Sequence, residues 1–543
     1  MNNLYYWIGT IGYCLAMVVI GVWIRRRIRH DQGEQMNFEF WIAKRQLPGW
    51  RLAVSLTSGW LMLGWLGFGM SQIYMYGATG LWILPIPWMI LCVIVIFMVP
   101  FIRRIAAVSL PQSIGKRYGP GARTMLAVMS FFVFIAWTQA ELFMGGVLMS
   151  RLLGVPIWLC MAIIIAPIIL YVWLGGFRAN VATDVAQFAI MAPFMIILTV
   201  VAVQQASAAS HGNILQAIGQ TAPPWAAPGK AMYLGFLGWL FPIVLLVGYL
   251  PGWLIEQDLV LRVQAAKSTR EARKAAVWGL GLIGIFVIVL PAIIAFCSMV
   301  IYPPDAAGNP NLAVGAEKGK EAYYICSALI ANLPAWLSVF MLVGIIACQM
   351  STVDTFANVS ALALAYDLIE PGMRKRNVSP KGRLLLARVI SVLVLLISLA
   401  CAVISDTLKD VYYISSGVLS ACVAIPSIFI FWRRTTLPAV LTAAVLGFAG
   451  TIGAFLYEYH FLQAADANLP HYYQNDLPTW ISPSYGYNYL AVGVGLSLAS
   501  IVAVSLLTRR PSARQLAAIE AVPVEEYERF TAGAVQHPSE NIS

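Results

Sequence analysis

Residues 348–358, CQMSTVDTFAN, place hydroxyl, amide and carboxylate side chains inside an otherwise apolar segment. The residues before them read AWLSVFMLVGIIA (335–347) and those after them read VSALALAY (359–366), so the whole stretch suits a helix that crosses a bilayer. An ionisable group such as Asp354 at the bilayer centre costs roughly 2.5–3.5 kcal/mol on insertion scales. Ionisable residues placed there usually serve a function, and this stretch therefore predicts a polar site inside a membrane-embedded helix bundle.

The composition of the whole chain agrees with this prediction. Of its 543 residues, 60% are hydrophobic and 11% are charged, and the mean hydropathy is +0.76. Soluble domains are about 45–50% apolar and about 25% charged, so the chain is predicted to be an all-α polytopic membrane protein. Segments of the ~20 apolar residues needed to cross a bilayer predict about 13 transmembrane helices. They lie near residues 4–24, 52–76, 80–102, 124–149, 155–175, 182–204, 232–255, 274–300, 335–364, 385–406, 411–432, 436–457 and 488–508.

The positive charges are distributed unevenly between the predicted loops. If the N-terminus lies outside the cell, 30 of the 35 Lys and Arg residues fall in cytoplasmic stretches. Cytoplasmic loops carry such an excess, so the chain is predicted to be N-out and C-in. The net charge of +11 then reflects topology and does not indicate a nucleic-acid partner. The five outer residues are Arg151, Lys230, Lys318, Lys320 and Lys409.

The apolar segments group into a single transmembrane domain, residues 1–508, followed by a tail at 509–543. The tail has 35 residues, too few for an independent catalytic domain, and it is predicted to lie in the cytoplasm. Three longer outer loops, 205–231, 301–334 and 458–487, are rich in Pro, Gly, Asn and aromatic residues. We expect them to form lids or short half-buried helices.

Two apolar segments are interrupted by Gly and Pro. Residues 55–77 read SLTSGWLMLGWLGFGMSQIYMYG and residues 234–254 read LGFLGWLFPIVLLVGYLPGWL. They run in opposite directions and lie five spans apart, which is typical of the broken helices in a transporter with two inverted five-helix repeats. These repeats would be about 52–204 and 232–432. Gly and Pro also serve close packing in membrane helices, which is the alternative explanation of either segment alone.

Five motifs, in order along the chain, resemble those of the sodium:solute symporter family, which contains bacterial proline permease, pantothenate permease and sodium–sugar cotransporters. The resemblance implies a LeuT-type core of two inverted repeats with peripheral helices, and Na⁺ as coupling ion without an organic cofactor. It also implies a multi-pass protein of the cell's inner (plasma) membrane, and the absence of N-x-S/T sequons from the outer loops fits a bacterial source. The motifs are WIAKRQLPGW (41–50), WLGGFRANVATDVAQ (173–187), LRVQAAKSTREARKA (261–275), QMSTVDTFAN (349–358) and FWRRTTLPAVLTAAVLG (431–447).

The resemblance also implies a main sodium site. Backbone carbonyls of the first broken segment and of the 335–364 span, together with two hydroxyls of that span, would hold the ion. Na⁺ is a hard cation that prefers oxygen ligands, and unwound backbone offers carbonyls for it. The alternative is that these hydroxyls bond the carbonyl four residues earlier in their own helix. The implied ligands are Val54, Thr57, Cys348, Ser351 and Thr352.

A second cation site is implied for relatives that carry one, and here it would use Asp184, Ser351, Asp354 and Thr355. Ser351, Asp354 and Thr355 are spaced i, i+3 and i+4, so they share one helix face. Small hydroxyl residues are more usual in the family at the position of Asp354, and a carboxylate there would favour a cation or carry a proton. Asp184 has an alternative role as a helix N-cap with Gln187 three residues on.

The substrate site is expected near the bilayer midplane, between the broken helices. The stretch SGWL (58–61) resembles that of proline-permease-like members. Those members have an acid just before it, where this chain has Leu56, and this difference weakens the case for a proline-like substrate. Glu141 is expected to face a cationic group of the substrate or a buried Arg, or else to reach the outer interface. The candidate residues are Ser58, Gly59, Trp60, Trp137, Thr138, Glu141 and Trp253.

These observations favour sodium-coupled symport of a small polar organic solute, an amino acid or a carboxylate, into the cell. Two alternatives stay open: a transporter-like sensor acting through a separate signalling partner, and a proton-coupled permease. An enzyme has little support, because the five His residues lie in loops or the tail and no H-E-x-x-H motif occurs. Besides the solute, the expected partners are sodium ions and the lipid bilayer; the sequence does not specify an oligomeric state.

Overall fold

The computed structural model describes residues 4–27, 34–104, 107–221, 229, 231–235, 239–304, 324–331, 333–404, 409–458, 488–512 and 516. Most of the predicted tail and most of the loops 301–334 and 458–487 lie outside these residues. Within them the chain forms helices and turns, with an isolated bridge between Leu47 and Ala266. The α-helices are α1 (Leu4–Arg27), α2 (Glu34–Ile42), α3 (Gly49–Trp60), α4 (Leu63–Tyr76), α5 (Pro85–Arg104), α6 (Leu110–Tyr118), α7 (Pro120–Leu153), α8 (Ile157–Ala209), α9 (Ile214–Gln220), α10 (Leu240–Trp253), α11 (Gln257–Ala265), α12 (Thr269–Ile283), α13 (Leu290–Ile301), α14 (Ile325–Ala331), α15 (Ala335–Ala361), α16 (Glu370–Lys375), α17 (Pro380–Val403), α18 (Lys409–Val418), α19 (Ile425–Ile428), α20 (Leu437–Tyr457) and α21 (Asn488–Leu507).

Six shorter elements of tighter or wider helix join them. Three are 3₁₀ turns and three are π turns, and π turns frequently mark functional sites. They are η1 (Ala43–Arg45), η2 (Gly77–Trp82), η3 (Gly284–Val289), η5 (Leu362–Ile369), η6 (Leu419–Ala424) and η7 (Phe429–Phe431).

Ten helices of the described residues are long and apolar enough to cross a membrane, or eleven if the bent pair α10 and α11 counts as one span. The sequence predicts about 13, and the difference has a structural reason. Helix α8 contains two predicted spans in one 53-residue element that is interrupted at Gly176 (φ 57°, ψ −153°). Helices α3 and α4 have 12 and 14 residues, so neither alone reaches the ~20 residues of a span.

The first Gly- and Pro-rich segment is interrupted in the structure, and the second bends at its end. The first opens between α3 and α4, where Leu61 (φ −79°, ψ 56°) and Met62 (φ −72°, ψ 133°) leave helical geometry. The second bends by 43° between α10 and α11, just after Pro251. Backbone carbonyls and N–H groups lose their helical partners at such breaks, so each break offers polar groups in the middle of the bundle.

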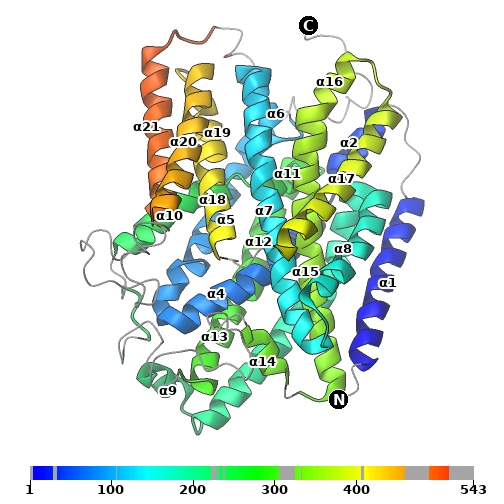
Figure 1. Cartoon of the computed structure of the whole chain (residues 1–543), viewed down its shortest axis with the longest axis vertical. Helices are drawn as coiled ribbons and strands as arrows, with labels where there is room; N and C mark the ends of the chain where they lie inside the picture. Colours follow the sequence, from blue (N-terminus) through cyan, green and yellow to red (C-terminus); the bar gives the residue numbers. More distant parts are fainter. Residues whose placement is uncertain are drawn as a thin grey trace.

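Helix α15 lies inside the bundle, packed against α7, α8 and α1, while α3 packs on α8 and α12 (Figure 1). The short helices α2, α6 and α16 from predicted cytoplasmic loops gather at the upper end of Figure 1, and α9 and α14 from predicted outer loops lie at the lower end. This arrangement agrees with the prediction that these two sets of loops lie on opposite sides of the membrane. Which end faces the cytoplasm stays a prediction.

Candidate functional site

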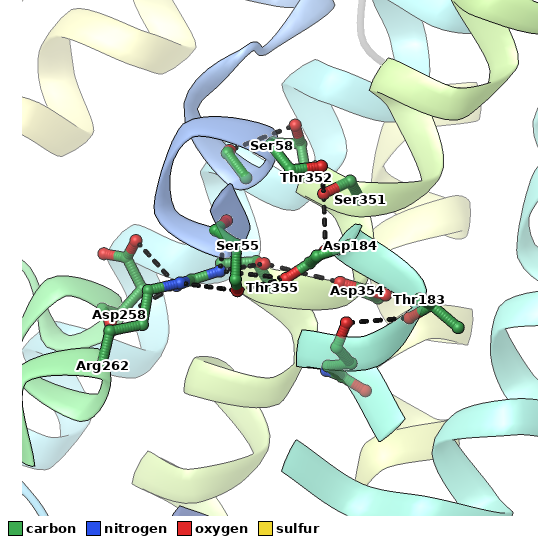
Figure 2. A network of polar contacts seen from close by, with 12 residues as sticks. Ser55, Ser58, Thr183, Asp184, Asp258, Arg262, Ser351, Thr352, Asp354 and Thr355 are labelled. Carbon is green, nitrogen blue, oxygen red and sulfur yellow. Dashed lines mark hydrogen bonds and ion pairs between the residues drawn. The ribbon is translucent and has the colours of Figure 1, made fainter. Parts of the chain in front are cut away.

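The break after α3 meets the polar stretch of α15. The Thr352 hydroxyl donates to the Gly59 carbonyl at 3.2 Å and to the Cys348 carbonyl of its own helix at 3.1 Å. The hydroxyl oxygens of Ser58 and Ser351 lie 2.8 Å apart (Figure 2). All five residues are buried, so hydroxyl and carbonyl oxygens from two helices converge beside the break.

Val54 and Thr57, the other predicted sodium ligands, lie earlier on α3 than the break. Val54 is half-buried within the helix. The Thr57 hydroxyl donates to the Ala53 carbonyl at 2.9 Å, and the Thr57 carbonyl accepts from the Leu61 N–H at 2.9 Å. The structure therefore brings Ser351, Thr352 and Cys348 together with Ser58 and Gly59, which are one and two residues after Thr57; ligation by the Val54 and Thr57 carbonyls stays a prediction.

Asp184 connects α8 to this cluster. Its carboxylate accepts from the Ser351 hydroxyl at 2.7 Å and from the Ser55 hydroxyl at 2.5 Å. Asp184 lies two turns beyond the interruption at Gly176, inside α8. Its carboxylate oxygens accept from hydroxyls of α3 and α15, not from N–H groups at the start of its own helix. The alternative role of Asp184 as a helix N-cap is therefore wrong.

Arg262 of α11 reaches into the same place, a residue that the sequence analysis did not select. One terminal nitrogen of its guanidinium lies 3.4 Å from the Asp184 carboxylate, 3.1 Å from the Thr355 hydroxyl and 3.2 Å from the Ser55 carbonyl. The other lies 3.3 Å from Asp258. The sequence signal for Arg262 was its i, i+4 spacing from Asp258 within QDLVLRV, since opposite charges four residues apart lie side by side on a helix.

Asp354 lies on the far side of this network from Arg262. Its carboxylate accepts from the Tyr171 hydroxyl at 2.5 Å and from the neighbouring Thr355 hydroxyl at 3.4 Å. Thr355 in turn accepts from Arg262 (Figure 2). The four residues predicted for the second cation site are thus joined in one hydrogen-bonded network.

The network contains more negative than positive groups. Asp184, Asp258 and Asp354 are at most 1% exposed, and Arg262 is 4% exposed. Arg262 is the cation that the described residues place among them. Uncompensated buried charge is costly, so the cluster has chemistry suited to binding a further cation or a proton.

Of the predicted substrate residues, Ser58 and Gly59 belong to the cluster at the break, and the other five fall into two groups. In the first, the Trp60 indole N–H donates to Asp258 at 2.9 Å, and the ring centroids of Trp60 and Trp88 lie 5.5 Å apart. Trp88 lies 6.0 Å from Trp253, which stacks on Tyr249 at 4.1 Å. Trp60 and Trp253 are therefore connected through aromatic neighbours on the α11 side of the break.

The second group lies on α7, where α4 begins. Both carboxylate oxygens of Glu141 accept from the Gly64 N–H at 3.1 Å, and the Tyr412 hydroxyl donates to the same carboxylate. The Trp137 ring packs 5.3 Å from Phe356. The Thr138 hydroxyl donates to the Phe134 carbonyl of its own helix at 2.6 Å, as the alternative explanation of membrane hydroxyls expects.

A family model for the sodium:solute symporter family matches residues 40–447, three quarters of the chain and all five motifs. The chain belongs to the sodium:solute symporter family. The family consists of transporters, so the prediction that the chain is not an enzyme is confirmed. The polar cluster described above lies wholly within the matched range.

Curated relatives of this symporter span most of its length. The sodium/glucose cotransporter of Vibrio parahaemolyticus is 24% identical over 464 residues, which are 80% of this chain and 82% of the relative. The high-affinity proline transporter PutP of Bacillus subtilis is 24% identical over 477 residues, which are 84% of this chain and 88% of the relative.

Two solved structures resemble the symporter in fold. A Na⁺-coupled sialic acid symporter in a substrate-bound outward-open state has a TM-score of 0.73 at 15% identity, covering 94% of this chain and 99% of that one. Mhp1, a nucleobase-cation-symport-1 family transporter in a closed conformation, has a TM-score of 0.53 at 12% identity, covering 89% and 98%. The predicted LeuT-type, all-α membrane fold is confirmed.

Proposed function

We propose that this chain is a sodium-coupled symporter that carries a small polar organic solute into the cell by alternating access. Its family supports this function, as do the two curated relatives, which are named for sodium-coupled and proline transport. The observation that carries the proposal is the convergence of the Ser351 and Thr352 hydroxyls on Ser58 and Gly59 at the break after α3. We place the transporter in a bacterial inner membrane, with residues 1–508 as one transport domain.

The coupling Na⁺ would be held beside this break by oxygen atoms of α3 and α15. Ser351 and Thr352 supply hydroxyls, and Gly59 and Cys348 supply carbonyls that already accept from Thr352. An ion in this place replaces hydroxyl protons as the partner of those carbonyls, since Na⁺ prefers hard oxygen ligands. The family resemblance implies the Val54 and Thr57 carbonyls as further sodium ligands. They would reach the ion if the last turn of α3 opened.

A second cation, Na⁺ or a proton, would bind between Asp184, Asp354, Ser351 and Thr355. The excess of buried carboxylates over Arg262 supports this proposal. Arg262 contacts Asp184 and Thr355 itself, so a second Na⁺ would compete with the guanidinium for the same oxygens. Movement of α11 away from α8 and α15 would separate Arg262 from Asp184 and Thr355 and open the site.

The driving force is sufficient for uptake. One Na⁺ crossing ~100 mV releases roughly 2.3 kcal/mol, while a tenfold solute gradient costs about 1.4 kcal/mol. Voltage acting on one ion therefore sustains roughly 40–50-fold accumulation of an uncharged or zwitterionic solute. A second coupled cation squares that ratio.

Reconstituted uptake tests the proposal. Purified protein in proteoliposomes is supplied with a panel of amino acids, organic acids and amines, with an inward Na⁺ gradient, an inward proton gradient, or neither. We expect at least one solute to accumulate only with the Na⁺ gradient. Accumulation driven by protons alone would support the permease alternative, and specific solute binding without uptake or Na⁺ dependence would support the sensor.

A further inference from the structure

Glu141 binds the start of a helix that belongs to the break. The first N–H groups of a helix have no partner within it, and the helix dipole makes this end attractive to anions. In transporters with broken helices, such half-helix N-termini point at the anionic group of a substrate. In this chain the carboxylate of Glu141 takes that place, with both oxygens on the Gly64 N–H of α4.

The contact is built into the surrounding structure. A Cβ atom added to Gly64 would lie 2.5 Å from the Glu141 Oε1 and 2.6 Å from the Tyr412 hydroxyl, so this close approach requires glycine. Tyr412 donates to the carboxylate, and the Gln349 side-chain amide donates to the Glu141 carbonyl. Helices α7, α15 and α18 thus fix Glu141 against α4.

The groups around Glu141 have unused hydrogen-bonding capacity. Glu141 is fully buried, and among the described residues no Lys, Arg or His lies within ion-pair distance of it. The Gln349 Oε1 and the Trp137 Nε1 are both buried without a hydrogen-bond partner in the part of the chain that the structure describes. The Gln349 Oε1 lies against Gly145, whereas the Glu141 carboxylate and the Trp137 indole, one turn apart on α7, together suit an ammonium group, because an aromatic face attracts cations.

We propose that Glu141 is a specificity-determining residue that supplies the anion at the start of α4, so that the transported solute is an amine without a carboxylate. A solute carboxylate would have to displace Glu141 from Gly64 and would be repelled by it. An ammonium group on the solute instead pairs with a carboxylate that no cation of the described structure neutralises. This inference rests on the proposed transport function and replaces the expected amino acid or carboxylate by an amine.

Matched solutes distinguish an amine transporter from an amino-acid transporter. Each pair differs by one carboxylate: ethanolamine and serine, putrescine and ornithine, cadaverine and lysine, histamine and histidine. Uptake into proteoliposomes under a fixed Na⁺ gradient is measured for both members. We expect at least one amine to be taken up tenfold or more faster than its amino-acid partner at equal concentration.

Glu141→Gln tests the role of the carboxylate, since it keeps the shape and removes the charge. We expect amine uptake to fall at least tenfold and the amine-to-acid ratio to fall toward one. Glu370→Gln is the matched control, because Glu370 is also a buried carboxylate but pairs with Arg374 and Arg383 at the end of the bundle. Tyr412→Phe, which removes only the hydroxyl donor, is expected to raise the amine KM while the Na⁺ dependence is retained.

The outcomes separate this inference from the transport proposal. Na⁺-driven uptake of amino acids in preference to every paired amine would overturn the role of Glu141 and leave symport standing. An unchanged amine preference in a folded Glu141→Gln protein would overturn it as well. Amine uptake that is lost in Glu141→Gln but indifferent to Na⁺ would support the role of Glu141 and contradict sodium coupling. If Glu141→Gln does not fold, two other results test the role of Glu141: the ratio of amine to amino-acid uptake in the wild type, and the amine KM of Tyr412→Phe. A ratio of one or below, or an unchanged KM, would overturn it.

Discussion

Ser351 joins three helices through one hydroxyl. It donates to Asp184 of α8 and lies 2.8 Å from Ser58 of α3, while its own backbone belongs to α15. A Na⁺ bound at this point would replace the hydrogen bonds of the hydroxyl, binding to its oxygen, and bring the same three helices together. Binding of the ion and closure of the bundle would therefore be coupled at a single side chain.

Asp354 departs from the family resemblance, in which small hydroxyl residues are more usual at this position. If it holds a second cation, Asp354→Asn removes the charge, while the amide oxygen still accepts from Tyr171. At ~100 mV we expect the solute accumulation ratio to fall roughly 40–50-fold, because one coupled cation is lost. The reversal potential of solute-induced current in proteoliposomes measures the stoichiometry directly.

Asp367→Asn is the control for this prediction. Asp367 is another buried carboxylate, paired with Arg123 and accepting from Ser109 near the start of α7. Its replacement is expected to change stability without changing the number of cations per solute. An Asp354→Asn protein with the wild-type stoichiometry would show that Asp354 is structural.

At the scale of elements, the start of α4 is the most constrained point. Gly64→Ala would place a Cβ against Glu141 and Tyr412, so the carboxylate must leave the helix end. We expect Na⁺-driven uptake to fall at least tenfold while the purified protein stays monodisperse. Gly281→Ala on α12 is the matched control, since a Cβ there meets no atom of the described residues within 4 Å; equal loss in both proteins would contradict the prediction.

The interruption of α8 at Gly176 makes a second prediction. Gly176 has φ 57° and ψ −153°, a region that residues with a Cβ rarely adopt, and a Cβ there would lie 2.7 Å from the Phe40 carbonyl oxygen. We expect Gly176→Ala to destabilise the protein by about 1–3 kcal/mol, seen as a lower midpoint of thermal unfolding in detergent. Gly453→Ala on α20 is the control, and equal midpoints for the two proteins would show that α8 tolerates the change.

The sequence predicted which helices supply the polar cluster, but not where the first of them opens. Hydropathy and Gly/Pro content locate a broken segment, but they do not show at which residue the backbone opens. The break falls at Leu61 and Met62, and Gly59 just before it accepts from Thr352; Val54 and Thr57 stay predicted ligands. Arg262 was missed because its loop resembled a basic cytoplasmic segment, and only tertiary packing carries α11 into the bundle. Tyr171 and Tyr412 had no signal among the 23 tyrosines.

At the scale of the whole molecule, the distribution of Lys and Arg predicts an N-out, C-in orientation. Helix α1 begins at the lower end of Figure 1 and α21 ends at the upper end, so the two termini are expected on opposite sides. Reporter fusions that are active only in the cytoplasm or only outside it measure this. We expect a cytoplasmic reporter to be active at the C-terminus and inactive at the N-terminus; the reverse result would invert the topology.

The most direct measurement of the central claim is solute-dependent uptake of radioactive Na⁺ into proteoliposomes containing wild-type protein or Ser351→Ala. The account predicts that a transported solute stimulates Na⁺ entry in the wild type, and that Ser351→Ala raises the Na⁺ concentration for half-maximal uptake at least tenfold. Ser360→Ala, whose hydroxyl bonds only the Phe356 carbonyl of its own helix among the contacts described, should behave as wild type. Solute entry without Na⁺ entry, or an unchanged Na⁺ requirement in Ser351→Ala, would contradict the account.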